Sequence, residues 1–105
     1  MPGSPGLGSA ARKLFRIYAL LTPDRLTAHY VGQTADALHR RLEDHLRRPG
    51  HSKKADWIRA VRESGDAPQI VLLEEFTGYR QQAYERETYW IRRLRAQGHP
   101  LKNVP

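Results

Sequence analysis

Residues 13–34 read KLFRIYALLTPDRLTAHYVGQT and contain two β-prone runs separated by a short polar link. The first run is apolar and aromatic from Leu14 to Leu21, and the second, AHYVGQT, occupies residues 28–34. Pro23 lies in the link at a position typical of a turn. Because so short a link joins antiparallel neighbours, the sequence predicts a β-hairpin here.

The residues after the hairpin predict two helices. Leu38, Leu42 and Leu46 recur at four-residue spacing and predict the first helix, with Asp36 as its expected cap. Ser52 is expected to cap the second helix, whose apolar stripe ends before a glycine. Both helices therefore have an apolar side that can cover a sheet.

A third strand and a long helix complete the predicted order. Residues 70–76 are apolar and β-branched, which indicates a strand, and residues 79–97 form a helix stopped by Gly98 and Pro100. The expected order is β-β-α-α-β-α in one domain over residues 12–105. Residues 1–11 are rich in Gly, Pro, Ser and Ala, and we predict a flexible N-terminal tail there, of the kind an expression tag leaves.

Composition narrows the class of partner. The 105 residues include 18 Lys and Arg against 11 Asp and Glu, a net charge of +7, which favours a polyanion and above all nucleic acid. The absence of cysteine excludes disulfides, zinc–thiolate clusters and a thiol nucleophile. No apolar run is long enough for a bilayer and no signal peptide is apparent, so we expect a cytoplasmic protein, nucleoid-associated in a prokaryote.

Two ionisable residues border the leucine stripe of the first predicted helix. Arg41 and His45 lie three and seven residues after Leu38, beside the packed face. One interpretation is structural: Arg41 extends its charge to solvent and His45 is a solvated edge residue. The other is that both belong to a site.

Glu87 is the stronger anomaly. It shares an otherwise apolar stripe of the last helix with Ala83, Ile91 and Leu94. A carboxylate there must be paired, bind a metal or have a raised pKa, because an unpaired buried charge is costly. The structural interpretation is a salt bridge to an arginine such as Arg41.

The hairpin adds two tyrosines and a glycine. Tyr18 and Tyr30 could be a stabilising cross-strand pair, and Gly32 indicates a bulge or a close backbone approach. Together with an arginine, a histidine and a carboxylate, these are the groups that phosphodiester hydrolysis needs: a ligand for a divalent cation, a cation for the phosphate, and a base for water. A tyrosine near its ordinary pKa of about 10 would need a cationic or metal-rich environment to act as that base.

Four short segments carry a family resemblance: RIYAL at residues 16–20, YVGQT at 30–34, RLEDH at 41–45 and ETYWI at 87–91. In this order and spacing they resemble the GIY-YIG endonuclease superfamily over residues 13–105. The resemblance implies an α+β fold with a small three-stranded antiparallel sheet flanked by helices. It also implies DNA hydrolysis with one Mg²⁺ or Mn²⁺, leaving 5′-phosphate and 3′-hydroxyl ends.

The resemblance assigns a role to each matched residue. Tyr18 would be the water-activating phenol, Arg41 the phosphate stabiliser and Glu87 the metal ligand. Tyr30 and His45 would position groups or relay protons.

Other positions support or modify this assignment. Gly32 corresponds to the glycine of the second half-motif, and Asn103 to an asparagine that closes the site. Arg16 replaces the glycine that gives the first half-motif its name, and Val31 replaces an isoleucine. Arg40 is the alternative to Arg41 as the catalytic arginine.

Further basic residues are candidates for phosphate contacts, although a merely solvated basic face is an equal interpretation: Arg47, Arg48, Lys53, Lys54, Arg59 and Arg62. With no recognition domain apparent, we expect low sequence specificity, with DNA shape, a partner protein or a homodimer deciding the target, as in repair or recombination. The alternatives are a catalytically silent nucleic-acid-binding module on the same scaffold and, less favoured, a basic domain that binds an acidic protein.

Overall fold

The elements follow one another in the predicted order. The structure is a computed structural model that describes residues 11–104, so all of the tail predicted over residues 1–11 except Ala11 lies outside the described part. The elements are β1 (Lys13–Leu21), β2 (Ala28–Thr34), α1 (Leu38–Arg47), α2 (Lys53–Glu63), β3 (Gln69–Gly78) and α3 (Arg80–Ala96).

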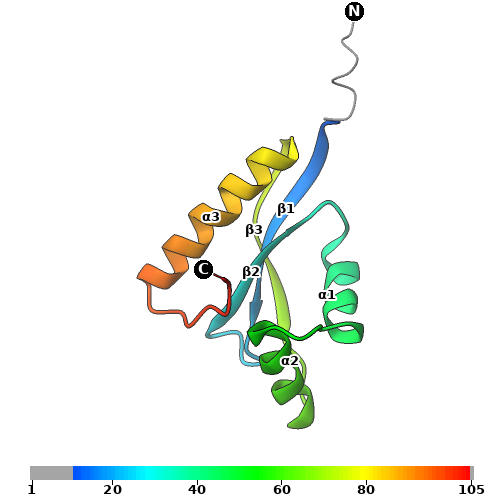
Figure 1. The fold of residues 1–105 in the computed structure, drawn as a ribbon, viewed down its shortest axis with the longest axis vertical. Coiled ribbons are helices and arrows are strands. Elements are labelled where there is room, and N and C mark those ends of the chain that lie inside the picture. Colours follow the sequence, from blue (N-terminus) through cyan, green and yellow to red (C-terminus); the bar gives the residue numbers. More distant parts are fainter. Residues whose placement is uncertain (1–10, 105) are drawn as a thin grey trace, which may run out of the picture.

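The three strands form one antiparallel sheet in the order β2-β1-β3. Helix α3 covers one face of this sheet, whereas α1 and α2 cover the other (Figure 1). The prediction of a small three-stranded antiparallel sheet flanked by helices is therefore confirmed.

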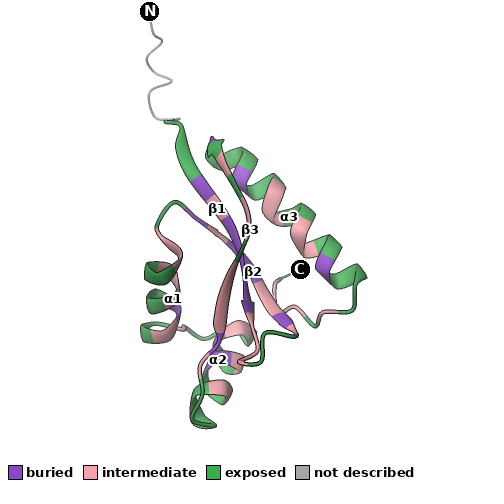
Figure 2. Cartoon of the chain, turned by 180° about the vertical axis from the view of Figure 1, so that it is seen from behind, coloured by how far each residue is buried: buried purple, intermediate pink, exposed green. Residues whose placement is uncertain are grey.

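Strand β1 lies at the centre of the core and is buried along most of its length (Figure 2). Successive side chains of a strand point to opposite faces. Ile17 and Ala19 accordingly belong to the apolar cluster under α3, and Tyr18 and Leu20 to the cluster under α1 and α2. Burial on both faces explains why the strand reads as a continuous apolar run.

Strand β2 contains a bulge next to its second tyrosine. Leu20 pairs with Tyr30, but Leu21 pairs with Ala28, so that His29 is an extra residue in β2. Bulges re-aim side chains. The effect here is that His29 and Tyr30, although adjacent, both contact the side chains of the α1 and α2 layer.

The outer edge of β2 is covered by the C-terminal segment, residues 99–103. The backbone N–H of Lys102 donates to the carbonyl of His29 at 2.7 Å. The amide of Asn103 accepts from the N–H of Val31 at 2.9 Å and donates to its carbonyl at 2.8 Å. The segment thus satisfies backbone groups that an edge strand would otherwise expose.

One of the two predicted helix caps is correct. Ser52 caps α2, with its hydroxyl oxygen accepting from the N–H of Ala55 at 3.2 Å. Asp36 does not cap α1, because the cap position is Ala37 and has no side-chain hydrogen bond. Instead, the N–H of Asp36 donates to the hydroxyl of Thr34, which holds the residue in the turn before the helix.

Candidate active site

Tyr18 passes over the one residue of β2 that has no side chain. Tyr18 and Gly32 are cross-strand partners, and a Cβ atom at Gly32 would lie within 2.5 Å of the Tyr18 Cζ. The backbone φ of Gly32 is not in the left-handed region, so its backbone conformation does not require glycine. Glycine is needed here because any side chain would overlap the Tyr18 ring. Of the two interpretations of Gly32, the structure supports a close approach, and the bulge lies elsewhere in the strand.

The hydroxyl of Tyr18 joins two side chains of α1. Arg41 donates its Nε–H to the Tyr18 oxygen at 3.0 Å, and the same oxygen lies 2.7 Å from Nε2 of His45. Because the oxygen already accepts from Arg41, we assign the phenol proton to the bond with His45, whose Nε2 is then the acceptor. His45 is only 3% exposed, so the interpretation of this residue as a solvated edge histidine is wrong.

Burial keeps both groups of this bond neutral. It raises the pKa of Tyr18 well above 10, Tyr30 adds to the rise, and Arg41 opposes it. It lowers the pKa of His45 to about 3, with smaller contributions from the positive charges of Lys54 and Arg41. Burial therefore leaves a protonated phenol beside a neutral imidazole, because the opposing effect of Arg41 on the Tyr18 pKa is smaller.

Tyr30 completes an aromatic cluster around His45. Its ring centroid lies 6.4 Å from that of Tyr18 and 5.6 Å from that of His45, the latter in an edge-on arrangement. The ammonium of Lys54 lies over the Tyr30 ring, 5.2 Å from its centroid. Lys54, predicted only as a peripheral phosphate contact, is thus a half-buried member of this cluster, and burial lowers its pKa.

Glu87, on α3, lies near enough to the two phenols for its charge to act on both. Its negative charge raises the pKa of both Tyr18 and Tyr30. The residue is half-buried, and burial raises its own pKa. The salt bridge between Glu87 and Arg41 is absent from the described residues 11–104, where Arg41 donates its Nε–H to Tyr18.

The Glu87 carboxylate fits a divalent cation held mainly by water and substrate. It has no hydrogen-bond or ion-pair partner among residues 11–104. Within the same residues there is no group of three or more His, Cys, Asp or Glu side chains suited to a metal. Mg²⁺ commonly uses one or two carboxylates and takes its other ligands from water and phosphate oxygens.

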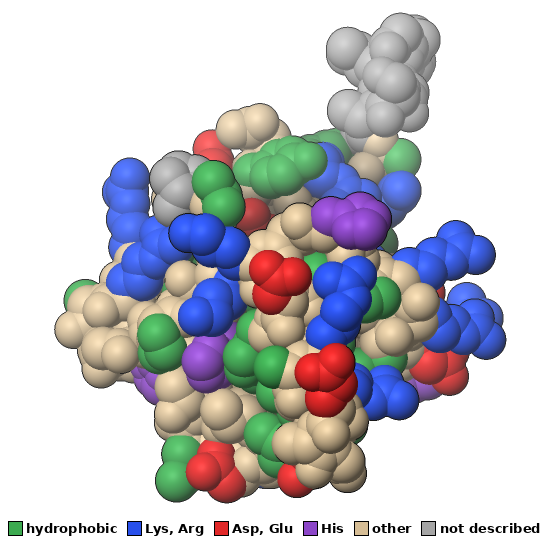
Figure 3. All heavy atoms as spheres, turned by 60° about the horizontal axis from the view of Figure 1, so that its bottom comes forward, with side chains coloured by type: hydrophobic (Ala, Val, Ile, Leu, Met, Phe, Trp, Pro, Cys, Tyr) green, Lys and Arg blue, Asp and Glu red, His purple; other side chains and the backbone are tan. Residues whose placement is uncertain are grey.

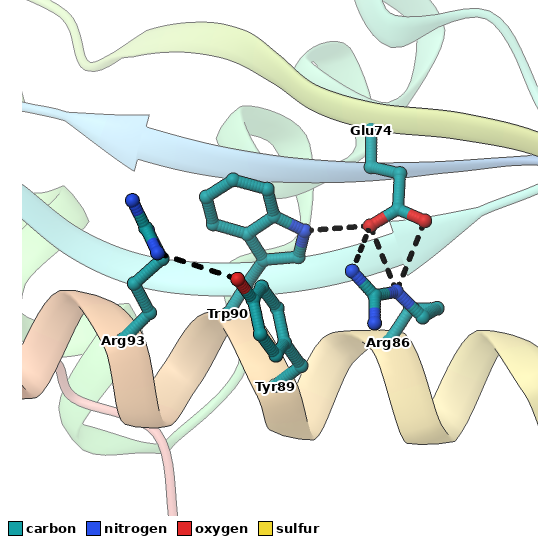
Figure 4. Close-up of polar contacts among 5 residues, drawn as sticks. All are labelled: Glu74, Arg86, Tyr89, Trp90 and Arg93. Atoms are coloured by element: carbon teal, nitrogen blue, oxygen red, sulfur yellow. Dashed lines mark hydrogen bonds and ion pairs between the residues drawn. The ribbon is translucent and has the colours of Figure 1, made fainter.

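A partly exposed hydrogen-bond network joins α3 to Glu74 of β3 (Figure 4). Its α3 members, Arg86 and Trp90, precede and follow Glu87 in the sequence. Glu74 of β3 accepts from Arg86 Nε at 2.9 and 3.0 Å, from Arg86 Nη2 at 2.8 Å, and from Trp90 Nε1 at 2.9 Å. The Arg86 guanidinium also lies 4.2 Å from the centroid of the Tyr89 ring. No local sequence signal predicted this role for Glu74, because its partners come from another element.

The six basic residues predicted to contact phosphate differ in their surroundings in the structure. Five of the six are exposed on α1, on α2 or just beyond α1: Arg47, Arg48, Lys53, Arg59 and Arg62. Arg59 has structural partners, the carbonyl of Gly50 and, at 3.6 Å, the carboxylate of Asp56. Figure 3 shows Lys and Arg side chains projecting from both sides of the face it presents, with carboxylates between them.

Two histidines, His29 and His99, make contacts with other elements that no local sequence pattern indicates. His29 stacks on Trp57 with ring centroids 4.6 Å apart and planes 13° from parallel. His99 accepts at Nδ1 from the N–H of Ala28 at 2.9 Å. Two further histidines are exposed: His39 and His51.

A small α+β scaffold that gathers two phenols, a guanidinium, an imidazole and an unpaired carboxylate has the groups of a phosphodiester nuclease. The family model described as the GIY-YIG catalytic domain matches residues 15–100, and the chain belongs to this family. It is a family of endonucleases that generally use a divalent metal. No curated protein and no solved structure matches the chain. None of the helices in residues 11–104 is long and apolar enough to cross a membrane.

Substitution of Gly32 by Ala is expected to displace the Tyr18 ring. The added methyl would overlap this ring, and overpacking of a well-packed core commonly costs about 1–3 kcal/mol. A misplaced reacting group can lower a rate by about 10²-fold. We therefore expect both losses, measured by urea unfolding and by cleavage of labelled DNA. A variant with wild-type stability and rate would contradict the close approach.

The buried imidazole of His45 is expected to make stability depend on pH. Its pKa is about 3 in the folded protein against 6.5 when unperturbed, so the unfolded chain binds a proton first as the pH falls. The contribution of the neutral imidazole to the free energy of unfolding is therefore complete above pH 6.5 and is lost as the pH falls toward 3. Linkage gives a loss of about 2 kcal/mol between pH 7 and pH 5. Urea unfolding at pH 7 and pH 5 should show that the free energy of unfolding falls by about 2 kcal/mol more in the wild type than in His45→Gln. Parallel pH profiles for the two proteins would contradict the prediction.

Proposed function

We propose that this protein is a metal-dependent DNA endonuclease of low sequence specificity, selective for the shape of its substrate. The observation that carries the proposal is the unpaired Glu87 carboxylate near the hydrogen-bonded cluster of Tyr18, Arg41 and His45. A charge left without a partner in a half-buried position is costly unless a ligand offsets it. The net charge of +7 favours a polyanionic substrate.

In this proposal Glu87 holds the divalent cation and Arg41 holds the phosphate. When bound, Mg²⁺ or Mn²⁺ would polarise the phosphodiester and stabilise the leaving oxygen. Arg41 spends only its Nε–H on Tyr18, and its two NH₂ groups have no other partner within residues 11–104. These donors match the geometry of phosphate oxygens.

The proton path runs from water to Tyr18 and from Tyr18 to His45. The phenol gives its proton to Nε2 of His45, and the resulting phenolate accepts a proton from the attacking water. The Arg41 guanidinium beside the oxygen opposes the effect of burial on the Tyr18 pKa, and the positive charge of the bound cation would stabilise the phenolate further. The water oxygen bonds to phosphorus while the bond from phosphorus to the 3′ oxygen breaks, and the 3′ oxygen takes a proton from solvent as it leaves. The products carry 5′-phosphate and 3′-hydroxyl ends, and His45 releases its proton to solvent. Tyr30, with Lys54 over its ring, positions the side chains of Tyr18 and His45.

The proposal is tested by cleavage of labelled duplex, branched and single-stranded DNA with Mg²⁺, Mn²⁺ or EDTA. We expect cutting that requires the metal, that varies with substrate shape more than with sequence, and that leaves ends a ligase can join. Binding to every substrate without cutting any of them would contradict the proposal and favour a silent nucleic-acid-binding module. The same mixtures analysed by size would show whether a homodimer forms on DNA.

A further inference from the structure

A hollow of about 340 Å³ lies between helix α2 and the C-terminal segment. It is lined by the side chains of Lys53, Asp56, Trp57 and Lys102. None of these four residues belongs to the hydrogen-bonded group of Tyr18, Arg41 and His45. The lining combines one aromatic ring with two ammonium groups and one carboxylate, so that stacking and charge both contribute to what it can hold.

The indole of Trp57 is held in place from within the protein. His29, the extra residue of the β2 bulge, stacks on it at 4.6 Å. Burial and the neighbouring charges of Lys102 and His99 lower the pKa of His29, which keeps its imidazole neutral. Trp57 is therefore a fixed, half-buried ring that also lines the hollow.

The two lysines come from anchored backbone. Lys102 donates its N–H to the carbonyl of His29, and the next residue, Asn103, is bound to both backbone groups of Val31. Lys53 opens α2, directly after the Ser52 cap. The remaining lining residue, Asp56, lies 3.6 Å from Arg59, which offsets its charge.

Two pairs of residues adjacent in the sequence connect the hollow to the candidate active site: Lys53 with Lys54, and His29 with Tyr30. Lys54, next to Lys53, lies over the Tyr30 ring, and Tyr30 follows His29 in β2. Trp57 and Tyr30 pack against the same apolar cluster. A DNA strand bound at Tyr30 can therefore continue into the hollow.

We propose that the hollow binds an unpaired nucleotide of the DNA strand beside the cleaved phosphodiester, with its base against Trp57 and its phosphate between Lys53 and Lys102. This inference rests on the proposed function and gives it a substrate class: DNA with single-stranded nucleotides next to a duplex. A paired base cannot reach the indole because its faces are covered in the stack. Stacking of bases on aromatic side chains tolerates any sequence.

The test compares a forked DNA with unpaired thymines and a fully paired duplex of equal length, both in EDTA so that nothing is cut. We expect the fork to bind more tightly and to quench tryptophan emission. Trp57→Leu should weaken fork binding by about 10–100-fold and leave duplex binding nearly unchanged. Trp90→Phe, which alters the other tryptophan on the opposite face of the sheet, should keep the quenching.

The inference would be overturned by equal quenching with fork and duplex, or by a Trp57→Leu variant that still prefers the fork. The emission of the wild type provides a measurement that no folding defect can confound. Lys102→Gln provides a second variant and should weaken fork binding and reduce its salt dependence, whereas an unchanged affinity would count against the phosphate contact. A chain that cuts forks and duplexes equally refutes this inference alone, and a chain that prefers forks but never cuts refutes the proposed cleavage alone.

Discussion

Replacement of Glu87 by Gln is expected to lower the rate of metal-dependent DNA cleavage by about 10³-fold or more, with DNA binding retained. The substitution keeps the size of the side chain and removes the charge that would hold the cation. The carboxylate has no protein partner within residues 11–104, so no interaction of the fold is lost. Cleavage should be measured with labelled DNA at saturating Mg²⁺, and binding by anisotropy in EDTA.

Stability and a matched variant separate this role from a structural one. Burial raises the pKa of Glu87, which means that the folded protein disfavours its charge, so Glu87→Gln should unfold at the same urea concentration as the wild type or a higher one. Glu85→Gln makes the same chemical change at an exposed position of the same helix and should leave the rate unchanged. Equal rates for the two variants would remove Glu87 from the site.

Substitution of Tyr18 by Phe is expected to lower the cleavage rate by about 10²–10⁴-fold, the usual contribution of a general acid or base. Its hydroxyl is the only group that joins Arg41 to His45 within the described residues. The substitution leaves a buried imidazole nitrogen unpaired, which costs about 1–3 kcal/mol of stability. Urea unfolding and single-turnover cleavage measure the two effects.

The control for Tyr18→Phe is the same change on the surface. Tyr84 is 54% exposed, and Tyr84→Phe should alter neither stability nor rate. The two effects of Tyr18→Phe also have different pH signatures. If the hydroxyl relays a proton, the variant loses the pH dependence of the rate; a uniform loss at every pH would mean that Tyr18 only supports the packing of the site.

Much of the fold could be predicted because its signals are local. The apolar run from residue 14 to 21 is a strand buried on both faces, and the leucines at 38, 42 and 46 are the inner stripe of α1. The failure of Asp36 as a cap has a physical cause: its backbone is held by Thr34 in the preceding turn, so the helix begins later. Local capping propensity gave way to tertiary geometry there.

The site was predictable in its members but not in their pairing. Spacing placed Arg41 and His45 beside a packed face and Glu87 on an apolar stripe, and all three are half-buried or buried. Which group binds which depends on distances across the sheet. The structure shows Arg41 bound to Tyr18 and leaves Glu87 without a partner among residues 11–104, so the structural interpretation of Glu87 as half of a salt bridge to Arg41 is wrong. The catalytic roles themselves stay predictions.

By itself the sequence determined the order of the elements and the family, because these follow from periodicity and from motifs of adjacent residues. Only the tertiary structure decided that the Tyr18 ring crosses Gly32, that Glu74 anchors α3 beside Glu87, and that His29 supports Trp57. Each of these contacts joins residues on different elements. Their geometry depends on the register of the strands, on one bulge in β2 and on the docking of helices, none of which is encoded in a single local window of the chain.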